Sequence, residues 1–305
     1  MVEILVGAGG WSYFEVPGDR LRRYSEAFRT VEVNSTYYRI PRLGRVEAWR
    51  RRVSPGFEFT VRCNRDLTWT LELGSMDACL EILGRMREVC TVLDARVLHV
   101  MSPAGFELSG ERVTMIDSLL SSGKFGGLRL AWEIRSRPAE GKERLLRVLQ
   151  DHGVVHSVDL SRESPAYSSD LAYSRLFGKG EHNVYQFTNS ELGDIDRRAR
   201  STGAAKVYLN FHGTRMYKDA ARISVYEATG KFPKLTHGVG VDSVIEVLGE
   251  DAQFPSTTSM LLKAQGWKVC EWEANQQFRV SDILSKIEEK RFQSLQDLQL
   301  ELRRL

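Results

Sequence analysis

The sequence predicts an α/β protein: a (β/α)8 barrel of the TIM type followed by a helical C-terminal appendage. Two observations support this fold class. Extended apolar segments alternate with amphipathic segments of helical period over the first 233 residues, and that alternation is typical of parallel sheets covered by helices. Polar and aromatic groups also collect where the extended segments end, which is where barrels carry their functional groups.

The expected strands are apolar runs rich in β-branched residues. They are Glu3–Ala8, Thr30–Ser35, Glu58–Cys63, Arg96–Met101, Arg129–Ile134, Val154–Asp159, Ala172–Leu176 and Lys206–Phe211. Helical periodicity is found between most of them, and the longest helix, residues 76–93, carries Leu80, Leu83 and Met86 on one stripe. The other expected helices are Leu21–Phe28, Val46–Arg52, Arg112–Leu120, Glu143–His152, Asp194–Ser201 and Tyr217–Ala228.

One connection departs from this pattern. Only Ser161–Asp170, rich in Ser, Pro and Tyr, separates the sixth and seventh strands. This segment is either a very short helix or an irregular loop, so an open doubly wound sheet is the structural alternative to the barrel.

The chain changes character near Lys234, so we predict a barrel over residues 1–233 and a helical region over residues 234–305. The helical region has its own apolar residues at helical spacing. A role of these helices in binding a protein partner is the alternative to simple packing. The expected helices are Asp242–Leu248, Ser256–Gln265 and Ser281–Leu305.

Composition constrains the partners. The 305 residues include 43 basic and 40 acidic side chains, a net charge of +3, so attraction to nucleic acid must come from local arginine clusters. Neither a secretory signal nor a membrane span is apparent, and we expect a cytoplasmic protein without a membrane partner. The four cysteines form no C-x-x-C pair, which favours buried free thiols; they are Cys63, Cys79, Cys90 and Cys270. The arginine clusters are Arg20, Arg22 and Arg23; Arg50, Arg51 and Arg52; and Arg197, Arg198 and Arg200.

The polar groups at the strand ends are the candidate site. Three carboxylates are the candidate catalytic residues: Glu32, Glu133 and Asp159. The candidate substrate-binding residues are Trp11, Asn34, Tyr37, Arg62, Asn64, Arg135, Arg175, Asn210 and His212. Arginines near aromatic rings suit a substrate that carries phosphate and a flat or sugar-like group. Carboxylates suit acid–base work or the stabilisation of an oxocarbenium-like centre.

Two alternatives stay open at this point. Glu133 with Arg175, or Asp159 with Arg135, could form structural ion pairs instead of a site. No organic cofactor is expected, but a divalent metal is an open alternative because the three carboxylates and His212 are competent ligands.

At these residues the sequence resembles the YecE-like family, known as domain of unknown function seventy-two. The resemblance covers about Val6 to Phe232. It rests on Gly7-Ala8-Gly9-Gly10-Trp11-Ser12-Tyr13, Phe28-Arg29-Thr30-Val31-Glu32-Val33-Asn34-Ser35-Thr36-Tyr37-Tyr38, Glu133-Ile134-Arg135, Tyr173-Ser174-Arg175-Leu176 and Val207-Tyr208-Leu209-Asn210. It implies a TIM-type barrel and, as a leading proposal for the family, DNA binding and the processing of damaged DNA.

The sequence departs from the family pattern in three places. The third strand of the family ends in a lysine, where Arg62 stands, which argues against a Schiff-base lyase step. The fourth ends in Gln-Leu-Pro-Pro, where this chain has His99-Val100-Met101-Ser102-Pro103. The seventh ends in Arg-Leu-His-Gly, where Phe177 replaces the histidine and removes a candidate proton shuttle or metal ligand.

We therefore expect a DNA-processing protein, a repair glycosylase or endonuclease-like hydrolase acting on damaged bases or abasic sites. One rival is an isomerase or lyase acting on a phosphorylated sugar or similar small molecule through the same carboxylates and arginines. The other is a non-catalytic binding module whose C-terminal helices recruit a protein partner.

Overall fold

The computed structural model is an α/β protein with parallel sheets, and it describes residues 2–123, 125–135, 139–274 and 276–305. The chain forms two compact units. The first comprises Met1–Leu176 and Asp196–His212, and the second comprises Phe177–Ile195 and Gly213–Leu305. The predicted boundary after residue 233 falls inside the second unit.

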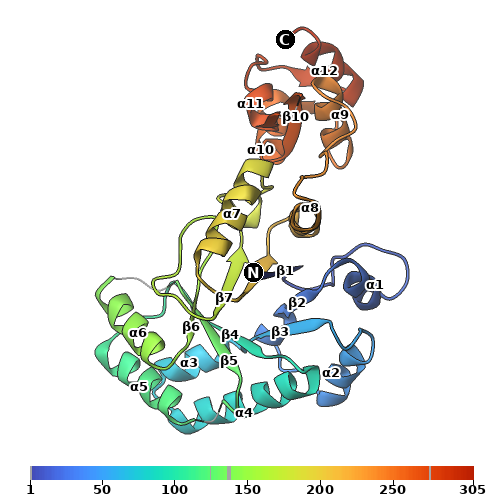
Figure 1. Ribbon diagram of the computed structural model, residues 1–305. Helices are drawn as coiled ribbons and strands as arrows, with labels where there is room; N and C mark the ends of the chain where they lie inside the picture. The colour runs from blue at the N-terminus through green and yellow to red at the C-terminus, as the bar shows by residue number, and fades with distance from the viewer. Residues whose placement is uncertain (1, 124, 136–138, 275) are drawn as a thin grey trace. The chain divides into compact units, whose positions relative to one another are not determined.

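Eight parallel strands form the sheets of the first unit (Figure 1). One sheet has the order β1-β8-β7 and the other β2-β3-β4-β5-β6. Three of the predicted strands have the predicted bounds, and the others differ by one or two residues at their ends. The bounds are β1 Glu3–Ala8, β2 Thr30–Val33, β3 Glu58–Arg62, β4 Val97–Ser102, β5 Arg129–Ile134, β6 Val155–Ser157, β7 Leu171–Leu176 and β8 Lys206–Phe211.

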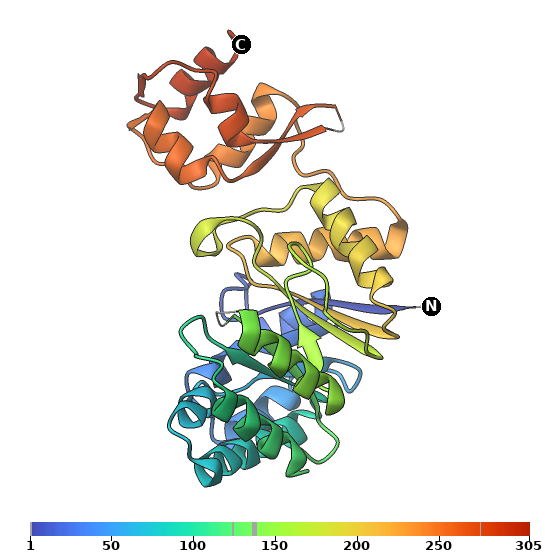
Figure 2. The ribbon, with the colours of Figure 1, turned by 90° about the vertical axis from the view of Figure 1, so that its left-hand side faces the viewer.

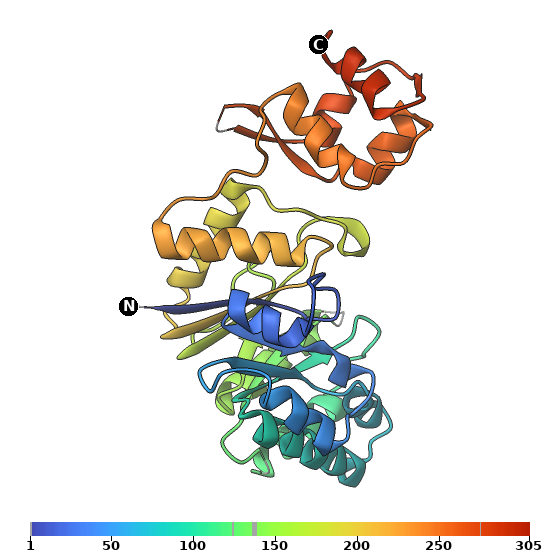
Figure 3. The same cartoon turned by 90° about the vertical axis from the view of Figure 1, so that its right-hand side faces the viewer.

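The two sheets meet at both of their edges. A parallel bridge between Val158 and Ser174 joins the end of β6 to β7. Between β1 and β2 the hydroxyl of Tyr24 takes the place of direct backbone hydrogen bonds. It accepts a hydrogen bond from the Ala8 N–H at 2.8 Å and donates one to the Thr30 carbonyl at 2.9 Å. The eight strands therefore follow one another in cyclic order, and Figure 3 shows β1 running alongside β8.

Helices cover the strands of the first unit. The helices α4, α5 and α6 pack side by side (Figure 1, Figure 2), with Leu83, Met86 and Cys90 of α4 buried as their helical spacing predicts. Helix α3 was not predicted, because its seven residues are too few to show a helical period. The bounds are α1 Arg20–Ala27, α2 Leu43–Arg50, α3 Asp66–Glu72, α4 Met76–Leu93, α5 Gly110–Ser121 and α6 Ala139–Asp151, with a 3-10 turn, η1, over Asn34–Tyr37. Helix α7, Asn189–Ser201, begins in the second unit and ends in the first.

The connection between β6 and β7 is an irregular loop rather than a helix. Hydrogen bonds within the first unit hold this loop in place. The Ala166 N–H donates to His156 Nδ1 at 3.0 Å, and the Tyr167 hydroxyl donates to the Val154 carbonyl at 2.7 Å.

The second unit is not purely helical, which corrects the prediction for residues 234–305. Strands β10 and β11 form an antiparallel hairpin, and the predicted helix over residues 281–305 is two short helices. The prediction of one helix was wrong because Ile287 reaches the core from an irregular segment. Phe292 reaches it from the short strand β12, which pairs with β9. The bounds are η2 Glu181–Asn183, α8 Met216–Thr229, α9 Val241–Gly249, β9 Ser256–Thr257, α10 Thr258–Gln265, β10 Val269–Glu273, β11 Gln276–Arg279, α11 Val280–Leu284, β12 Arg291–Phe292 and α12 Leu295–Leu302.

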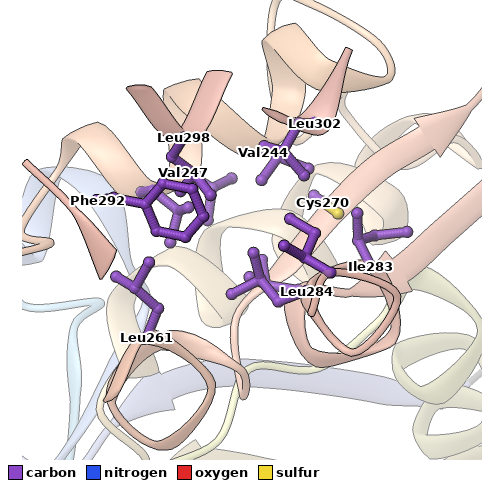
Figure 4. Packing of buried hydrophobic residues seen from close by; sticks show 12 residues of the cluster. Val244, Val247, Leu261, Cys270, Ile283, Leu284, Phe292, Leu298 and Leu302 are labelled. Atoms are coloured by element: carbon purple, nitrogen blue, oxygen red, sulfur yellow. The ribbon is translucent and has the colours of Figure 1, made fainter. Parts of the chain in front are cut away.

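A separate apolar core holds these C-terminal elements together (Figure 4). Val244 and Val247 of α9, Leu284 of α11 and Leu298 of α12 are buried within it. Each fully buried aliphatic side chain contributes about 1.5–3 kcal/mol of hydrophobic stabilisation. None of the helices among the described residues is long and apolar enough to span a membrane.

Removal of the Tyr24 hydroxyl tests the closure between β1 and β2. The variant Tyr24→Phe leaves a buried N–H and a buried carbonyl without their partner. We expect its free energy of unfolding to fall by about 1–3 kcal/mol in urea titrations. Tyr38→Phe, whose side chain is exposed, is the matched control. An equal effect of both variants would show that Tyr24 does not join the strands.

Candidate functional site

A cluster of charged and titratable side chains lies within the first unit, and we call it the charged cluster. Its members come from the carboxyl-terminal halves of β2, β3, β5 and β7, from the middle of β4 and from the residue after β8. Residues two apart on a strand point to the same side of the sheet, which is why Tyr173 and Arg175 both reach this cluster from β7. The charged cluster consists of Glu32, Arg62, His99, Glu133, Arg175 and His212.

Arg175 holds the two carboxylates of the charged cluster. Its Nε lies 3.1 Å from Glu32 Oε2, and its Nη1 donates to Glu133 Oε2 at 2.9 Å. The Arg175 side chain is only 2% exposed, and that of Glu32 is fully buried. A buried charge is tolerated only when it is paired and hydrogen-bonded, so this arginine and these carboxylates stabilise one another.

A hydroxyl pair completes the coordination of Glu32. The Tyr173 hydroxyl donates to Glu32 Oε2 at 2.8 Å and lies 2.8 Å from Thr60 Oγ1. Tyr173 and Thr60 were not predicted as site residues. The signal that could have found Tyr173 is its position two residues before Arg175 on the same strand.

The surrounding charges keep both carboxylates ionised. Burial alone would raise the pKa of Glu32, but the positive charge of Arg175, the largest opposing cause, lowers the pKa to about 2. Burial opposes ionisation of Glu133 too, yet Arg175 and His99 hold the pKa of Glu133 well below its usual value. Glu32 and Glu133 therefore act as fixed negative charges and not as proton donors.

Both histidines of the charged cluster are neutral. Burial, together with the charge of Arg175, lowers the pKa of His212 to about 3. Burial also lowers the pKa of His99, whose ring stacks on Tyr173 with centroids 5.3 Å apart. His99 Nε2 lies 3.4 Å from Glu133 Oε2. His99 was not predicted as a site residue, because the apolar run around it gives no sign of its contact with Glu133.

Arg62 is the one arginine of the charged cluster without an ion pair among the described residues. Its Nη1 donates to Asn34 Oδ1 at 2.7 Å, and its guanidinium lies 3.6 Å from the centroid of the Tyr37 ring. Its Nη2 contacts only the sulfur of Met101, and its Nε has no hydrogen-bond partner in the described part of the chain. Burial lowers the pKa of Arg62, with Arg175 acting in the same direction. This guanidinium has free donors for an anion.

A cleft of about 360 Å³ opens beside Asn34. The loop after β1 forms one wall, where Gly10 has a φ of 116° that favours glycine. Trp11 packs edge-on against Trp49, with ring centroids 5.3 Å apart. Asn34 both lines the cleft and accepts from Arg62, so it links the cleft to the charged cluster. The lining residues are Gly9, Gly10, Trp11, Ser12, Tyr13, Asn34, Ser35 and Tyr38.

Two predicted site residues have other surroundings. Asn64 donates to the Thr36 carbonyl and accepts from the Asp66 N–H, so it holds the start of α3. Asp159 accepts from the backbone and the hydroxyl of Ser161, which shapes its own loop. Asn64 thus ties η1 to the start of α3, whereas the recorded bonds of Asp159 are local, as short polar side chains often make with nearby backbone.

Two further predicted residues adjoin the charged cluster. Arg135 Nε donates to Glu133 Oε1 at 2.5 Å. Asn210 is fully buried on β8, in register with Gly7 and Arg175, and its amide has no hydrogen-bond partner among the described residues. A buried amide of this kind is typical of a place that an ordered water or a ligand group satisfies.

No group of three or more His, Cys, Asp and Glu side chains in the described ranges is arranged to hold a metal ion. The carboxylates of Glu32 and Glu133 are engaged by Arg175 instead.

The pH dependence of stability tests the role of Glu32. Its pKa falls from 4.5 to about 2 on folding, so its stabilisation is complete above about pH 5 and is lost as the pH falls toward 2. We expect this carboxylate to account for about 3 kcal/mol of acid-induced loss of stability. Urea unfolding between pH 7 and 2 should show a smaller loss for Glu32→Gln, which starts about 3–5 kcal/mol less stable. A wild-type profile shared by Glu32→Gln would contradict this role, and Glu47→Gln, at an exposed site, is the control.

Comparison with known proteins identifies the family of this chain. A search of curated proteins gives no match. Among solved structures, two crystal structures of a DUF72 family protein from Enterococcus faecalis V583 are similar at a TM-score of 0.59, with 17% and 18% identity. They cover 76% of this chain and 99% and 97% of their own. This likeness shows a shared fold.

A sugar phosphate isomerase/epimerase from Parabacteroides distasonis ATCC 8503 is similar at a TM-score of 0.47 and 10% identity, covering 77% of this chain and 99% of its own. The family model described as "Protein of unknown function DUF72" matches residues 5–227. The chain belongs to the DUF72 family, as its sequence motifs indicated.

Proposed function

We propose that the protein is a nucleic-acid-processing hydrolase of the glycosylase or endonuclease-like kind, acting on a damaged base or an abasic site. The observation that carries this proposal is the pairing of Arg62 with the aromatic cleft. A buried guanidinium with free donors adjoins, through Asn34, a cleft walled by Trp11 and Tyr38. Phosphate and a flat base are what such a pair of features recognises.

The cyclic strand order supports a closed (β/α)8 barrel as the scaffold of this site. In such a barrel all the strands end at one mouth. The charged cluster and the cleft are then at the carboxyl end of the strands, where barrel enzymes bind their substrates.

A single nucleotide unit fits the dimensions of the cleft. Its volume of about 360 Å³ lies within the range of small-ligand sites, roughly 300–1,000 Å³. In this proposal the base stacks against Trp11 or Tyr38, and a phosphate oxygen accepts a hydrogen bond from the guanidinium of Arg62. Extrusion of a nucleotide is easiest for a damaged or unpaired base, which gives the site its selectivity.

Glu133 is the proposed catalytic carboxylate. Its side chain is 13% exposed, whereas that of Glu32 is fully buried. Because Glu133 is ionised, it orients the attacking water and stabilises positive charge on the sugar. Glu32 positions Arg175 and exchanges no proton. Asp159, bound to Ser161 in its own loop, receives no catalytic role in this proposal.

An isomerase or lyase acting on a phosphorylated sugar would use the same arginines. Such enzymes move a proton to or from carbon, which is efficient when the pKa of the base lies near the working pH. The pKa values of Glu32 and His212 are lowered to about 2 and about 3. This charge state favours hydrolysis over isomerisation.

Oligonucleotides that carry a uracil, an oxidised pyrimidine or an abasic site test the proposal. We expect cleavage of at least one of them, and we expect Glu133→Gln to lower the rate constant by about 100-fold or more with binding nearly unchanged. Arg62→Gln should instead weaken binding by about 10-fold, since it removes a charge-assisted contact. Glu47→Gln, at an exposed position paired with Arg51, is the matched control.

Each result separates the alternatives. Binding without turnover on every substrate would leave a non-catalytic binding module. Turnover of a phosphorylated sugar without any action on nucleic acid would favour the isomerase or lyase. Full activity of Glu133→Gln would exclude Glu133 as the catalytic carboxylate.

A further inference from the structure

We propose that a surface around the cleft binds single-stranded nucleic acid, with bases stacked on exposed aromatic rings and phosphates bound by arginines. We call it the arginine–aromatic surface, and it comprises Tyr13, Tyr38, Trp69, Arg39, Arg45 and Arg65. It deepens the proposed function by naming the form of the substrate. It also stands without any catalysis, because binding alone tests it.

Three large aromatic side chains are exposed on this surface. Tyr13 is 80%, Tyr38 64% and Trp69 60% exposed. Exposed apolar side chains mark an interaction site when they gather in one patch, and Tyr13 and Tyr38 gather at the cleft. Each offers a flat face that any base can stack on, worth about 1–3 kcal/mol per base.

Contacts connect these rings to the cleft within one unit of the structure. Tyr13 and Tyr38 both line the cleft, and the Tyr37 and Tyr38 rings lie 5.1 Å apart. The Arg65 N–H donates to the Tyr37 carbonyl at 3.1 Å, and the Arg65 guanidinium lies 5.9 Å from the Trp69 ring. The surface therefore continues from the cleft to α3.

The arginines of this surface are free to bind anions. Arg39, Arg45 and Arg65 are exposed and form no ion pair in the part of the chain that the structure describes. Arg45 stands over Trp49, 5.7 Å from its ring centroid, and Trp49 packs on Trp11 of the cleft. A guanidinium held against a ring stays charged and keeps its donors available for phosphate.

Neighbouring arginines serve the structure instead. Arg22 and Arg23 pair with Glu26, and Arg51 pairs with Glu47. These members of the predicted arginine clusters form solvated ion pairs on α1 and α2. These arginines are useful controls, because their substitution removes the same positive charge without changing the arginine–aromatic surface.

The charge distribution along the chain favours a polyanion at this surface. Residues 11–72 contain twelve arginines, no lysine and eight acidic residues, a net charge of +4, whereas the whole chain carries +3. Arginine alone supplies the positive charge, and arginine combines phosphate binding with stacking on bases. A duplex hides its base faces, so exposed rings beside a cleft for one nucleotide suit a single strand.

Fluorescence anisotropy with labelled, undamaged oligo-dT and oligo-U of about 12 nucleotides tests this surface. We expect binding that weakens between about 50 and 200 mM salt and that exceeds binding to a duplex of the same length. Arg39→Gln/Arg65→Gln should lower the affinity by about 10-fold or more. It should also reduce the salt slope, the slope of log K against the logarithm of the salt concentration, by about 1.4, or about 0.7 per lost phosphate contact. Tyr38→Ala/Trp69→Ala should lower the affinity by about 10-fold or more while the salt slope stays unchanged.

The control Arg22→Gln/Arg51→Gln removes two paired charges, and we expect it to change the affinity by less than about two-fold. Equal losses in this control and in Arg39→Gln/Arg65→Gln would overturn the proposal, since attraction would then be unspecific. Equal or tighter binding of duplex, or binding to anionic vesicles with no binding to either oligonucleotide, would overturn it too. The ratio of oligo-dT to oligo-U affinity tells which nucleic acid is preferred, since the rings and arginines accept both. Because these strands carry no lesion, loss of cleavage in the earlier assay leaves this test unaffected.

Discussion

The bond network of Arg175 with Glu32 and Glu133 is the constraint on which the site depends. It joins β7 to β2 and β5, so the strands that supply the charges are held at fixed positions by those same charges. Two buried carboxylates would repel each other and take up protons without a cation between them. With Arg175 in place both stay ionised, and the neutral His99 and His212 fit beside them.

Because Glu32 and Glu133 pair with Arg175, Arg62 has no ion pair among the described residues. Arg175 contacts both Glu32 and Glu133, and Arg135 contacts Glu133. Arg62 is held by the amide of Asn34 and the ring of Tyr37. An arginine held in this way keeps unfilled donor positions at low local dielectric, where a bound anion is attracted strongly. The same chain segment then exposes arginines and rings outside the cleft. Arginine thus serves both the structural ion network and the proposed anion-binding surface. Arginines with a carboxylate partner belong to the network, and arginines without one belong to the proposed surface.

Much of the first unit could be predicted from particular residues. Strands β1, β5 and β8 have the predicted bounds because short apolar runs bounded by glycine, charged or other polar residues are strong local signals. Arg175 and Glu133 were recognised because each places a charge inside an apolar run, and such a charge must find a partner. Helix α3 and the hairpin β10–β11 were missed, since elements this short repeat either pattern only about twice. Asn64 and Asp159 stay predictions, and their recorded bonds go to backbone groups of Thr36 and Ser161.

By itself, the sequence determined the α/β class, the family, and which residues stand at strand ends, because these depend on local pattern and on motifs of neighbouring residues. The tertiary structure alone decided which charges pair. Glu32 and Arg175 are 143 positions apart, and nothing local says that Arg175 meets two carboxylates while Arg62 meets an amide and a ring. Pairing depends on distances of 3–4 Å between side chains from separate strands, and only the packed sheet brings those side chains together.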